Sequence, residues 1–392
     1  MNIVGIIAEY NPFHYGHAFH LAQARRITGA SHVIVVMSGN YVQRGVPAMF
    51  DKYTRAHAAL LGGADLVLEL PPGTATGSAE HFAKGAVGLL AATGVVTDLC
   101  FGSECGDITA LTRPARILAE EPDAYRKLLK EFLRAGNSFP RARMLALHQF
   151  DPAVPQNLLK DPNNLLGIEY LKAVYCQNLP LRTHTIRRTG ASYHDYQMNP
   201  AAFSSAGGIR KAFLESHGDI TSDIRTQLPF AEIYLPYHGK IPVTEDAFSL
   251  LLLERLIRDP SEDLSLYFDV TEELANRIQN HVDDFISFSR FTDLLKTKNL
   301  TRTSVSRALL HILLGIRKQE TAGVLRVLGF RREAAPLLKE LTLHGQMPLF
   351  ISRPDAALPA YWLYADRLYE HVRSLLHGQP FQNEFRRKTL VI

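Results

Sequence analysis

The chain contains 392 residues, 46% of them hydrophobic and 21% charged, with a formal net charge of +4. This length predicts two domains rather than one, and the composition excludes the disordered and fibrous classes. The three cysteines argue against a disulfide scaffold and favour a reducing cytosol. Cys100 and Cys105 lack a second cysteine pair, so we predict no metal site. Residues 1–2 lack the charged segment of a signal peptide, and no apolar stretch approaches the ~18 residues of a membrane span. We therefore expect a cytoplasmic protein without membrane association.

The first predicted element is a buried parallel strand, because residues 2–8 form a near-continuous apolar run. Pro12 ends the strand, and a helix begins at His17. A strand, a tight turn and a helix N-terminus form an anion site, because free main-chain N–H groups and the helix dipole point at the turn. His14 and His17 add donors that can be charged or neutral near pH 7. A helix cap and a surface residue are the alternative interpretation of these two histidines.

Further apolar runs that alternate with helices, up to about residue 215, predict an α/β fold with a doubly wound parallel sheet. In such sheets ligands bind at the carboxyl ends of the strands. Residues 107–175 interrupt the alternation and are predicted to be a mostly helical insertion. The strand ends expected beside the histidine turn are Met37-Ser38-Gly39, Phe101-Gly102 and Ile186-Arg187-Arg188.

The chain is expected to divide near residue 215. Residues 1–215 form the predicted sheet domain. Residues 216–245 are predicted to be a linker, because they contain several prolines and a glycine that favour turns. From residue 246 to residue 392 the pattern is mostly α-helical. Thr271 and Ser304 are predicted N-caps of two of these helices, because their hydroxyls can accept hydrogen bonds from free main-chain N–H groups.

Basic residues concentrate in the predicted helical half. Between Arg290 and Lys318 seven lysines and arginines stand against Asp293 alone, and clustered positive charge is the electrostatic footprint of a phosphate backbone. A solvated helix face is the alternative interpretation of such a run. The residues for which we predict RNA contact are Arg290, Lys296, Lys298, Arg302 and Arg307.

Four polar residues allow two interpretations each. Lys52 and Arg55 either approach a phosphate or an acceptor group, or lie in an exposed first helical turn. Asn163 and Asn164 open a later helix, where asparagine commonly caps. The other interpretation is that at least one of these two asparagines contacts a purine or a ribose, which the family resemblance described below favours.

Two further features constrain the predicted site. Arg187 and Arg188 are adjacent, so in an extended segment they should point apart, one toward phosphate and the other toward solvent or RNA. His20 continues the series of His14 and His17, but it lies six residues from His14 on a face that has turned away. A metal site built from these three histidines is therefore not expected.

The segment at residues 11–17, Asn-Pro-Phe-His-Tyr-Gly-His, resembles the HxGH signature of the Rossmann-like nucleotidyltransferase superfamily. With its other motifs the chain resembles the bacterial tRNA(Met) cytidine acetate ligase family, over essentially its whole length and most strongly over residues 1–211. Those other motifs are Val36-Met37-Ser38-Gly39-Asn40, Gln43-Arg44-Gly45, residues 63–71, Phe101-Gly102-Ser103-Glu104, residues 162–170 and residues 204–211.

The resemblance implies an ATP-binding nucleotidyltransferase domain in residues 1–215 and a tRNA-binding domain in residues 246–392. It also implies that ATP activates acetate as acetyl-adenylate and that the acetyl group passes to N4 of the wobble cytidine of elongator tRNA(Met). His14 and His17 would then be catalytic and would steady the charge that develops at the α-phosphorus. Mg²⁺ is expected to bridge the phosphates, and no protein partner is expected.

The ATP site that the resemblance implies combines the first turn, the end of a later strand, an asparagine pair, an arginine pair and the segment before a final arginine. Its members are Ile7, Ala8, Glu9, Tyr10, Asn11, Pro12, Phe13, His14, Tyr15, Gly16, His17, His20, Gly102, Asn163, Asn164, Arg187, Arg188, Ser205 and Arg210. One departure is Gly207-Gly208, which stands where such enzymes usually carry a hydroxyl residue, so that main-chain N–H groups alone would bind phosphate there.

Two other functions remain open. One is an adenylyltransferase that acts on a small metabolite, which the long helical half disfavours. The other is a non-catalytic RNA-binding protein with this fold, which the intact pair of His14 and His17 disfavours. ATP-dependent release of pyrophosphate, measured with and without acetate and tRNA, separates all three functions.

Overall fold

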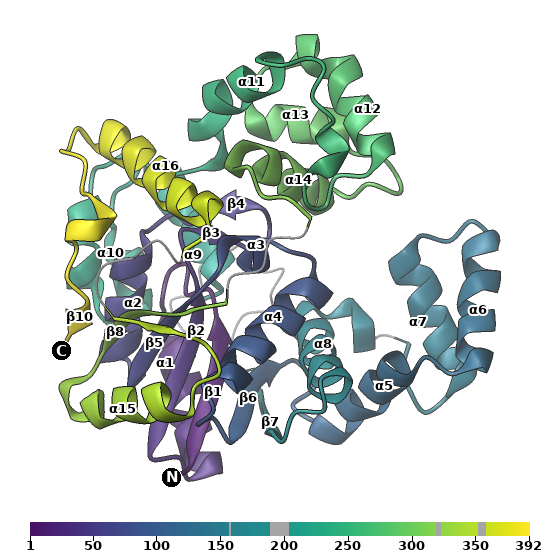
Figure 1. Cartoon of the computed structure of the whole chain (residues 1–392), viewed down its shortest axis with the longest axis horizontal. Helices are drawn as coiled ribbons and strands as arrows, with labels where there is room; N and C mark the ends of the chain where they lie inside the picture. Colours follow the sequence, from purple (N-terminus) through teal and green to yellow (C-terminus); the bar gives the residue numbers. More distant parts are fainter. Residues whose placement is uncertain (157, 189–203, 319–322, 352–357) are drawn as a thin grey trace.

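The computed structural model of the chain describes residues 1–156, 158–188, 204–318, 323–351 and 358–392. Within these residues the centre of the fold is an eight-stranded sheet with the order β10-β8-β5-β2-β1-β6-β7, to which β9 adds beside β8 (Figure 1). Five strands are parallel to one another, which confirms the predicted α/β fold. They are β1 (Ile3–Ala8), β2 (His32–Ser38), β5 (Leu66–Leu70), β6 (Asp98–Ser103) and β7 (Arg182–Arg187).

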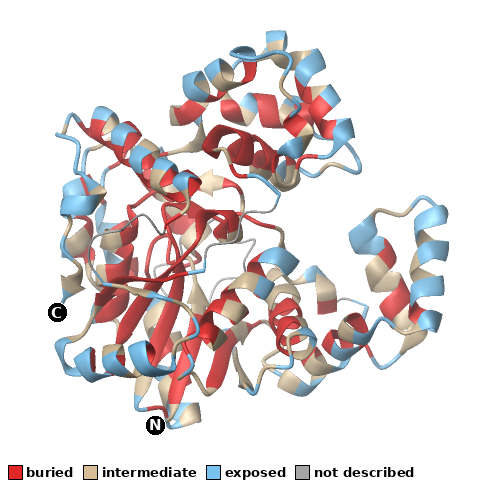
Figure 2. Ribbon diagram, viewed as in Figure 1, coloured by how far each residue is buried: buried red, intermediate tan, exposed pale blue. Residues whose placement is uncertain are grey.

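Both faces of β1, β2, β5 and β6 are buried, because their side chains alternate between two hydrophobic cores, whereas the edge strand β7 is only partly buried. In β2, Val36 joins the core that α4 (Ala79–Ala92) covers. Its neighbour Val35 joins the core that α1 (Tyr15–Thr28) and α2 (Lys52–Leu61) cover. Figure 2 shows the result, with buried residues concentrated in the strands and in the helix faces that touch them.

The sheet order makes β1 a topological switch point. From β1 the chain proceeds through β2 to β5 on one side, whereas β6 and β7 are added on the other side. Ligands of open α/β sheets bind outside the carboxyl ends of the strands at such a point. The turn at residues 9–14 follows β1 directly and therefore lies at the expected position.

The predicted helical insertion lies between β6 and β7. Its last helix packs against α4 and α5, whereas two of its helices form a hairpin that projects from the body of the molecule (Figure 1). We refer to this hairpin, residues 123–150, as the arm. The helices are α5 (Ile108–Glu120), α6 (Asp123–Arg134), α7 (Phe139–Phe150) and α8 (Pro162–Cys176).

Residues 216–245 differ from the predicted linker, because they pack on the sheet domain. They follow α9 (Ala206–Glu215) and include α10 (Ser222–Gln227) and a 3₁₀ segment in which Tyr234 is buried in the core beside α2. The Tyr234 hydroxyl accepts a 3.1 Å hydrogen bond from the N–H of Phe13. The prolines and glycines do mark turns here, but the buried tyrosine fixes the segment to the sheet domain.

Four helices pack around another hydrophobic core and form what we call the helical lobe. They are α11 (Ser249–Ile257), α12 (Glu272–His281), α13 (Phe288–Leu295) and α14 (Arg302–Leu314). Thr271 caps α12, as predicted, by accepting a hydrogen bond from the Leu274 N–H. The prediction that Ser304 is an N-cap is wrong, because α14 begins earlier and Thr301 accepts the Ser304 N–H.

The last part of the chain returns to the sheet, so the prediction that residues 246–392 form one helical domain is wrong for that part. β8 (Leu325–Phe330) pairs antiparallel with β5, and β9 (Leu349–Phe350) and β10 (Leu390–Val391) pair parallel with β8. A short apolar run fits a helix and a strand equally well in the sequence, and the pairing with distant β5 decides between them.

The remaining elements connect these parts. They are the hairpin of β3 (Tyr41–Val42) and β4 (Val46–Pro47), the short α3 (Pro72–Ala75), α15 (Ala335–His344) and α16 (Ala360–His377). Among the described helices, none is both long enough and apolar enough to cross a membrane.

Candidate functional site

The turn after β1 is built around His14 and His17. His14 is the N-cap of α1, and its Nδ1 accepts a 3.1 Å hydrogen bond from the Gly16 N–H. In return, the Nδ1 of His17 accepts a 3.3 Å hydrogen bond from the His14 N–H, which completes a capping box. A Cβ atom at residue 16 would lie 2.9 Å from the His14 ring, so the motif requires glycine there.

The hydrogen bonds and the surroundings fix the protonation of both rings. Burial, followed by the positive charges of Arg188 and Arg210, lowers the pKa of His14 to about 3. Burial also lowers the pKa of His17 well below its ordinary value. Both rings are therefore neutral at pH 7, and because each Nδ1 accepts, each Nε2 carries the proton. The pair thus offers two N–H donors without adding net charge.

A cavity of about 240 Å³ lies at this switch point. Its walls come from the end of β1, the start of α1, the ends of β6 and β7, the start of α8 and the start of α9. Many residues of the predicted ATP site line it: Ile7, Ala8, Glu9, Tyr10, Asn11, His14, Gly16, His17, His20, Gly102, Asn163, Arg187, Arg188, Ser205 and Arg210.

Four residues of the predicted site do not line the cavity. Pro12 and Phe13 are buried in the turn beneath it, and Phe13 belongs to the core. Tyr15 is 43% exposed on the outer side of α1. Asn164 is buried, and its Oδ1 accepts hydrogen bonds of 3.1 Å from the N–H groups of Glu104 and Cys105. It ties α8 to the end of β6. Asn163 lines the cavity, and its Nδ2 donates a 2.6 Å hydrogen bond to Oε1 of Glu104.

Positive charge lines one side of the cavity. Arg187 and Arg188 both line it and both are also exposed, so the expectation that one of them points toward solvent or RNA remains a prediction. Burial lowers the pKa values of His14, His17 and His20 most, and the positive charge of Arg188 lowers each of them further. Its guanidinium is therefore the one that faces the histidines.

The N-terminus of α9 supplies further N–H groups. The Ser205 hydroxyl accepts a 3.0 Å hydrogen bond from the Gly208 N–H and so caps this helix. Ala206 and Gly207 line the cavity beside it. From the same helix, Nη1 of Arg210 donates a 2.7 Å hydrogen bond to the carbonyl of Asn11. A helix N-terminus flanked by arginines is suited to bind phosphate.

Two polar atoms in the cavity wall are buried without a hydrogen-bond partner among the described residues, namely Oη of Tyr10 and Nε2 of His20. Burial, followed by Arg188, lowers the pKa of His20 to about 4. Unsatisfied buried polar groups are rare. In the described part of the chain, no cluster of three or more His, Cys, Asp or Glu could hold a metal ion.

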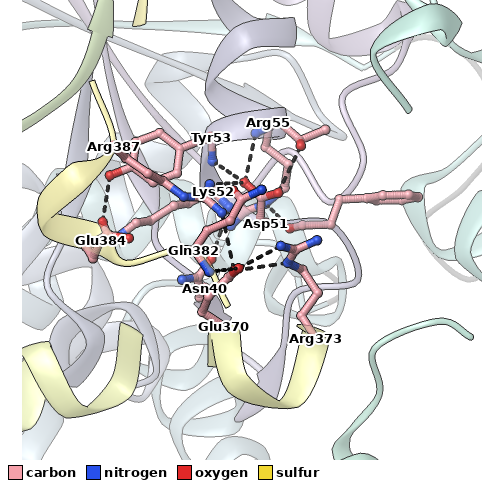
Figure 3. Close-up of polar contacts among 12 residues, drawn as sticks. Asn40, Asp51, Lys52, Tyr53, Arg55, Glu370, Arg373, Gln382, Glu384 and Arg387 are labelled. Atoms are coloured by element: carbon pink, nitrogen blue, oxygen red, sulfur yellow. Dashed lines mark hydrogen bonds and ion pairs between the residues drawn. The ribbon is translucent and has the colours of Figure 1, made fainter. Parts of the chain in front are cut away.

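Both predicted interpretations of Lys52 and Arg55 are wrong, because each side chain is completely buried and bound within the protein. Nζ of Lys52 forms an ion pair of 2.7 Å with Asp366 and another of 2.9 Å with Glu384. Figure 3 shows Lys52 and Glu384 among the polar residues of this region. Arg55 donates to main-chain carbonyl groups, including a 2.6 Å bond to Glu9. The sequence gives no sign of these partners, since two of them lie more than 300 residues away.

The cavity also has an apolar wall, of which the sequence analysis expected only Phe101 beside the histidine turn. The wall is formed by Phe82, Phe101, Leu166 and Tyr170, and the rings of Phe101 and Tyr170 lie 5.6 Å apart between their centroids. Such a wall suits the flat face of a purine. In the sequence Phe82, Leu166 and Tyr170 look like any other residues of the core, so no local signal separates them.

The predicted RNA-contact residues lie in the helical lobe, and three of the five already have partners. Lys296 pairs with Asp293 at 3.1 Å, and Arg302 pairs with Asp293 at 3.4 Å. Arg307 is only 12% exposed and pairs with Asp269 at 2.6 Å. Arg290 and Lys298 are exposed, with no recorded ion pair among the described residues. RNA contact at these positions remains a prediction.

Comparisons with known proteins agree with this arrangement. A family model described as HIGH Nucleotidyl Transferase matches residues 1–383. A tRNA(Met) cytidine acetate ligase from Clostridium perfringens is 37% identical, with 88% of this chain and 89% of the relative aligned. One from Halothermothrix orenii is 36% identical, with 100% and 99% aligned.

Two crystal structures of Thermotoga maritima TmcAL, an apo form and a form bound with alpha-thio ATP, are similar to this structure. Each has a TM-score of 0.87 with 100% of both chains covered, and the sequence identities are 31% and 30%.

Proposed function

We propose that this chain, which belongs to the tRNA(Met) cytidine acetate ligase family, activates acetate with ATP and acetylates N4 of the wobble cytidine of elongator tRNA(Met). The observation that carries the proposal is the capped, neutral pair of His14 and His17 at the start of α1. These rings, the α9 N-terminus and the guanidinium groups of Arg188 and Arg210 line one cavity. Such a set of donors suits a triphosphate.

In the first step, a carboxylate oxygen of acetate attacks the α-phosphorus of ATP, and the bond from that phosphorus to pyrophosphate breaks. A carboxylate is already deprotonated at neutral pH, so this step needs no general base. Neutral histidines fit that requirement, because they donate hydrogen bonds to the α-phosphate oxygens without accepting a proton. Arg188 and Arg210 offset the charge of the departing pyrophosphate.

In the second step, N4 of the cytidine attacks the carbonyl carbon of acetyl-adenylate. The bond from that carbon to the AMP oxygen breaks, the nitrogen loses one proton, and AMP leaves. The wall that contains Phe101 and Tyr170 would hold the adenine throughout, and Asn163 would contact the ribose or the base. Holding both reactants in one cavity contributes to the rate acceleration of such a transfer.

The proposal includes Mg²⁺ as a bridge between phosphates. Within the described residues no group of three metal-ligating side chains is available, so the phosphate oxygens would be its principal ligands. Acetate, elongator tRNA(Met) and a cytoplasmic location complete the proposal.

The test is to incubate the purified protein with ATP, labelled acetate and total tRNA. We expect label in tRNA(Met), together with AMP and pyrophosphate in equal amounts. Pyrophosphate release that does not depend on acetate or on tRNA would favour an adenylyltransferase that acts on a small metabolite. Absence of any ATP turnover would favour a non-catalytic RNA-binding protein.

A further inference from the structure

Positive charge is concentrated on the arm rather than on the helical lobe. Residues 123–150 contain six lysines and arginines against two acidic residues. Residues 245–318, which contain the lobe, hold ten basic residues against twelve acidic ones. A polyanion is therefore attracted to the arm more than to the lobe.

The basic residues of α6 form a stripe on one face. Lys127, Lys130 and Arg134 follow one another at spacings of three and four residues, so they share a face about 10 Å long. All three are exposed, as is Arg141 in the first turn of α7. In the described structure, the ion pairs of the arm involve other arginines and none of these four.

The turn between the two helices of the arm presents an aromatic ring. Phe139 is 56% exposed at the start of α7, close in the chain to Arg134 and Arg141. An exposed aromatic ring among arginines and lysines is the arrangement on which unpaired bases stack. The apolar face of α6 is covered by the protein itself. Tyr125 is buried in the hydrophobic core that α4 covers, and Phe132 packs against that core. The helix therefore has no free apolar face for insertion into a membrane surface.

The arm is connected to the wall of the cavity. Nη2 of Arg143 on α7 lies 2.6 Å from Oε1 of Glu169 on α8, and Glu169 is only 2% exposed. The same helix carries Asn163 and Tyr170 into the cavity. An RNA held by the arm is thus held in a fixed relation to the reaction site.

We propose that the arm is an RNA-binding surface, in which the stripe of Lys127, Lys130 and Arg134 binds phosphates and Phe139 stacks on an unpaired base. The identification of that RNA as the tRNA substrate rests on the function proposed above. The basic charge and the exposed ring on the arm are independent of that function.

The first experiment measures tRNA affinity for K127Q/K130Q/R134Q between about 50 and 200 mM salt. We expect binding to weaken at least ~10-fold and the salt dependence to fall by roughly 2–3 units, about 0.7–0.9 for each of the three lost phosphate contacts. The matched control is R332Q/K339Q/R367Q, which removes the same charge from exposed positions outside the arm. The control should bind nearly as the wild type does.

The second experiment tests the aromatic ring. F139A should weaken tRNA binding about 5- to 100-fold, whereas F139W should retain it. The chain has one tryptophan, Trp362, which is fully buried. In F139W a second, exposed tryptophan reports stacking directly, and its fluorescence should be quenched when tRNA binds.

Unchanged tRNA affinity and salt dependence in the stripe variant would overturn the proposal. So would stripe-dependent binding to phosphatidylglycerol vesicles combined with wild-type tRNA binding. Acetate-dependent exchange of pyrophosphate into ATP, measured without tRNA, should stay at the wild-type level in every arm variant. If the arm binds tRNA but the wild-type protein never acetylates it, the proposed function fails and the RNA-binding surface stands.

Discussion

Nη1 of Arg55 donates a 2.6 Å hydrogen bond to the main-chain carbonyl of Glu9, the first residue after β1. The same guanidinium also donates to the carbonyls of Ser38 and Gly39 at the end of β2. Arg55 thus holds the carboxyl ends of two neighbouring strands together. Because Glu9 begins the turn that carries His14 and lines the cavity, Arg55 is a positioning residue for the site.

We therefore expect R55K to impair adenylation although Arg55 does not line the cavity. Lysine keeps the charge but cannot donate to several carbonyls at once, and each buried carbonyl left unsatisfied costs about 1–3 kcal/mol. A turn displaced by ~1 Å can reduce the rate by ~10²-fold. Steady-state kinetics of acetate-dependent pyrophosphate exchange should show a raised KM for ATP and a lowered kcat.

R25K is the matched control for that variant. Arg25 also donates to main-chain carbonyls, at 2.7 Å to Ser31 and 3.1 Å to Gly63, but these lie at the opposite end of the sheet. We expect R25K to lower the unfolding temperature while KM for ATP stays at the wild-type value. A pattern in which both variants change KM equally would contradict a positioning role for Arg55.

Removing the donor of His17 should affect chemistry far more than folding. We expect H17A to reduce adenylation ~10²- to 10³-fold, the range for loss of one preorganised donor. It also removes a capping hydrogen bond, which costs ~1 kcal/mol. H17Q should recover the stability, because a glutamine three residues after the N-cap can bond back to it. Near wild-type acetyl-adenylate formation by H17A would refute the role given to this ring.

The lowered pKa of His14 predicts a specific pH dependence of stability. The folded protein binds a proton at this residue near pH 3, whereas the unfolded chain binds it near pH ~6.5. Below ~6.5 the unfolded state holds more protons, so His14 destabilises the fold increasingly as the pH falls.

H14N isolates this effect, because asparagine can still cap α1 but does not titrate. Between about pH 7.5 and about pH 5.5 the variant should lose roughly 1 kcal/mol less free energy of unfolding than the wild type. Urea denaturation at the two pH values measures this difference. Parallel losses in both proteins would mean that His14 is not held neutral.

The local parts of the fold and site could be predicted from the sequence. An apolar strand, a turn with Gly16 and a helix start form a continuous segment, and the histidine pair within it lines the cavity as expected. Residues whose role depends on distant partners could not be assigned. Arg307 appears in the sequence as one more basic residue, yet Asp269 neutralises it.

The same limit explains the errors in the domain description. Residues 325–330 form a short apolar run with no local mark of a strand, and β5 recruits them as its antiparallel neighbour. Phe101 and Tyr170 line the cavity only because β6 ends beside the start of α8. The basic residues of the arm can be counted in the sequence. Their role in binding RNA could not be inferred from it, because the sequence does not show that basic residues of the helical lobe, such as Arg307, are paired with carboxylates.

Lys52 gives the most demanding test of how the C-terminal segment is attached. Burial and Arg326 act to lower the pKa of Lys52, but Asp366, Glu384 and Glu69 outweigh them and raise it, so the ammonium group stays charged. It lies 2.9 Å from Glu69 on β5 and 2.7 Å from Asp366 on α16. The carboxylates of the core strand and of the C-terminal segment thus share one buried cation (Figure 3 shows Lys52 beside Glu384).

We expect K52M to lower the free energy of unfolding by ~3–5 kcal/mol, because it leaves buried carboxylates without their partner. K52M/E69Q should be at least ~1 kcal/mol more stable than K52M, because the second change removes one of those uncompensated charges, and contacting residues are not additive. Urea denaturation measures both differences.

In K52M, trypsin should also cleave after the exposed Arg386 faster than in the wild type, since the loss of the Lys52–Glu384 ion pair loosens the tail. A cost below ~1 kcal/mol for K52M, with unchanged cleavage, would show that Arg326 alone suffices to hold these carboxylates.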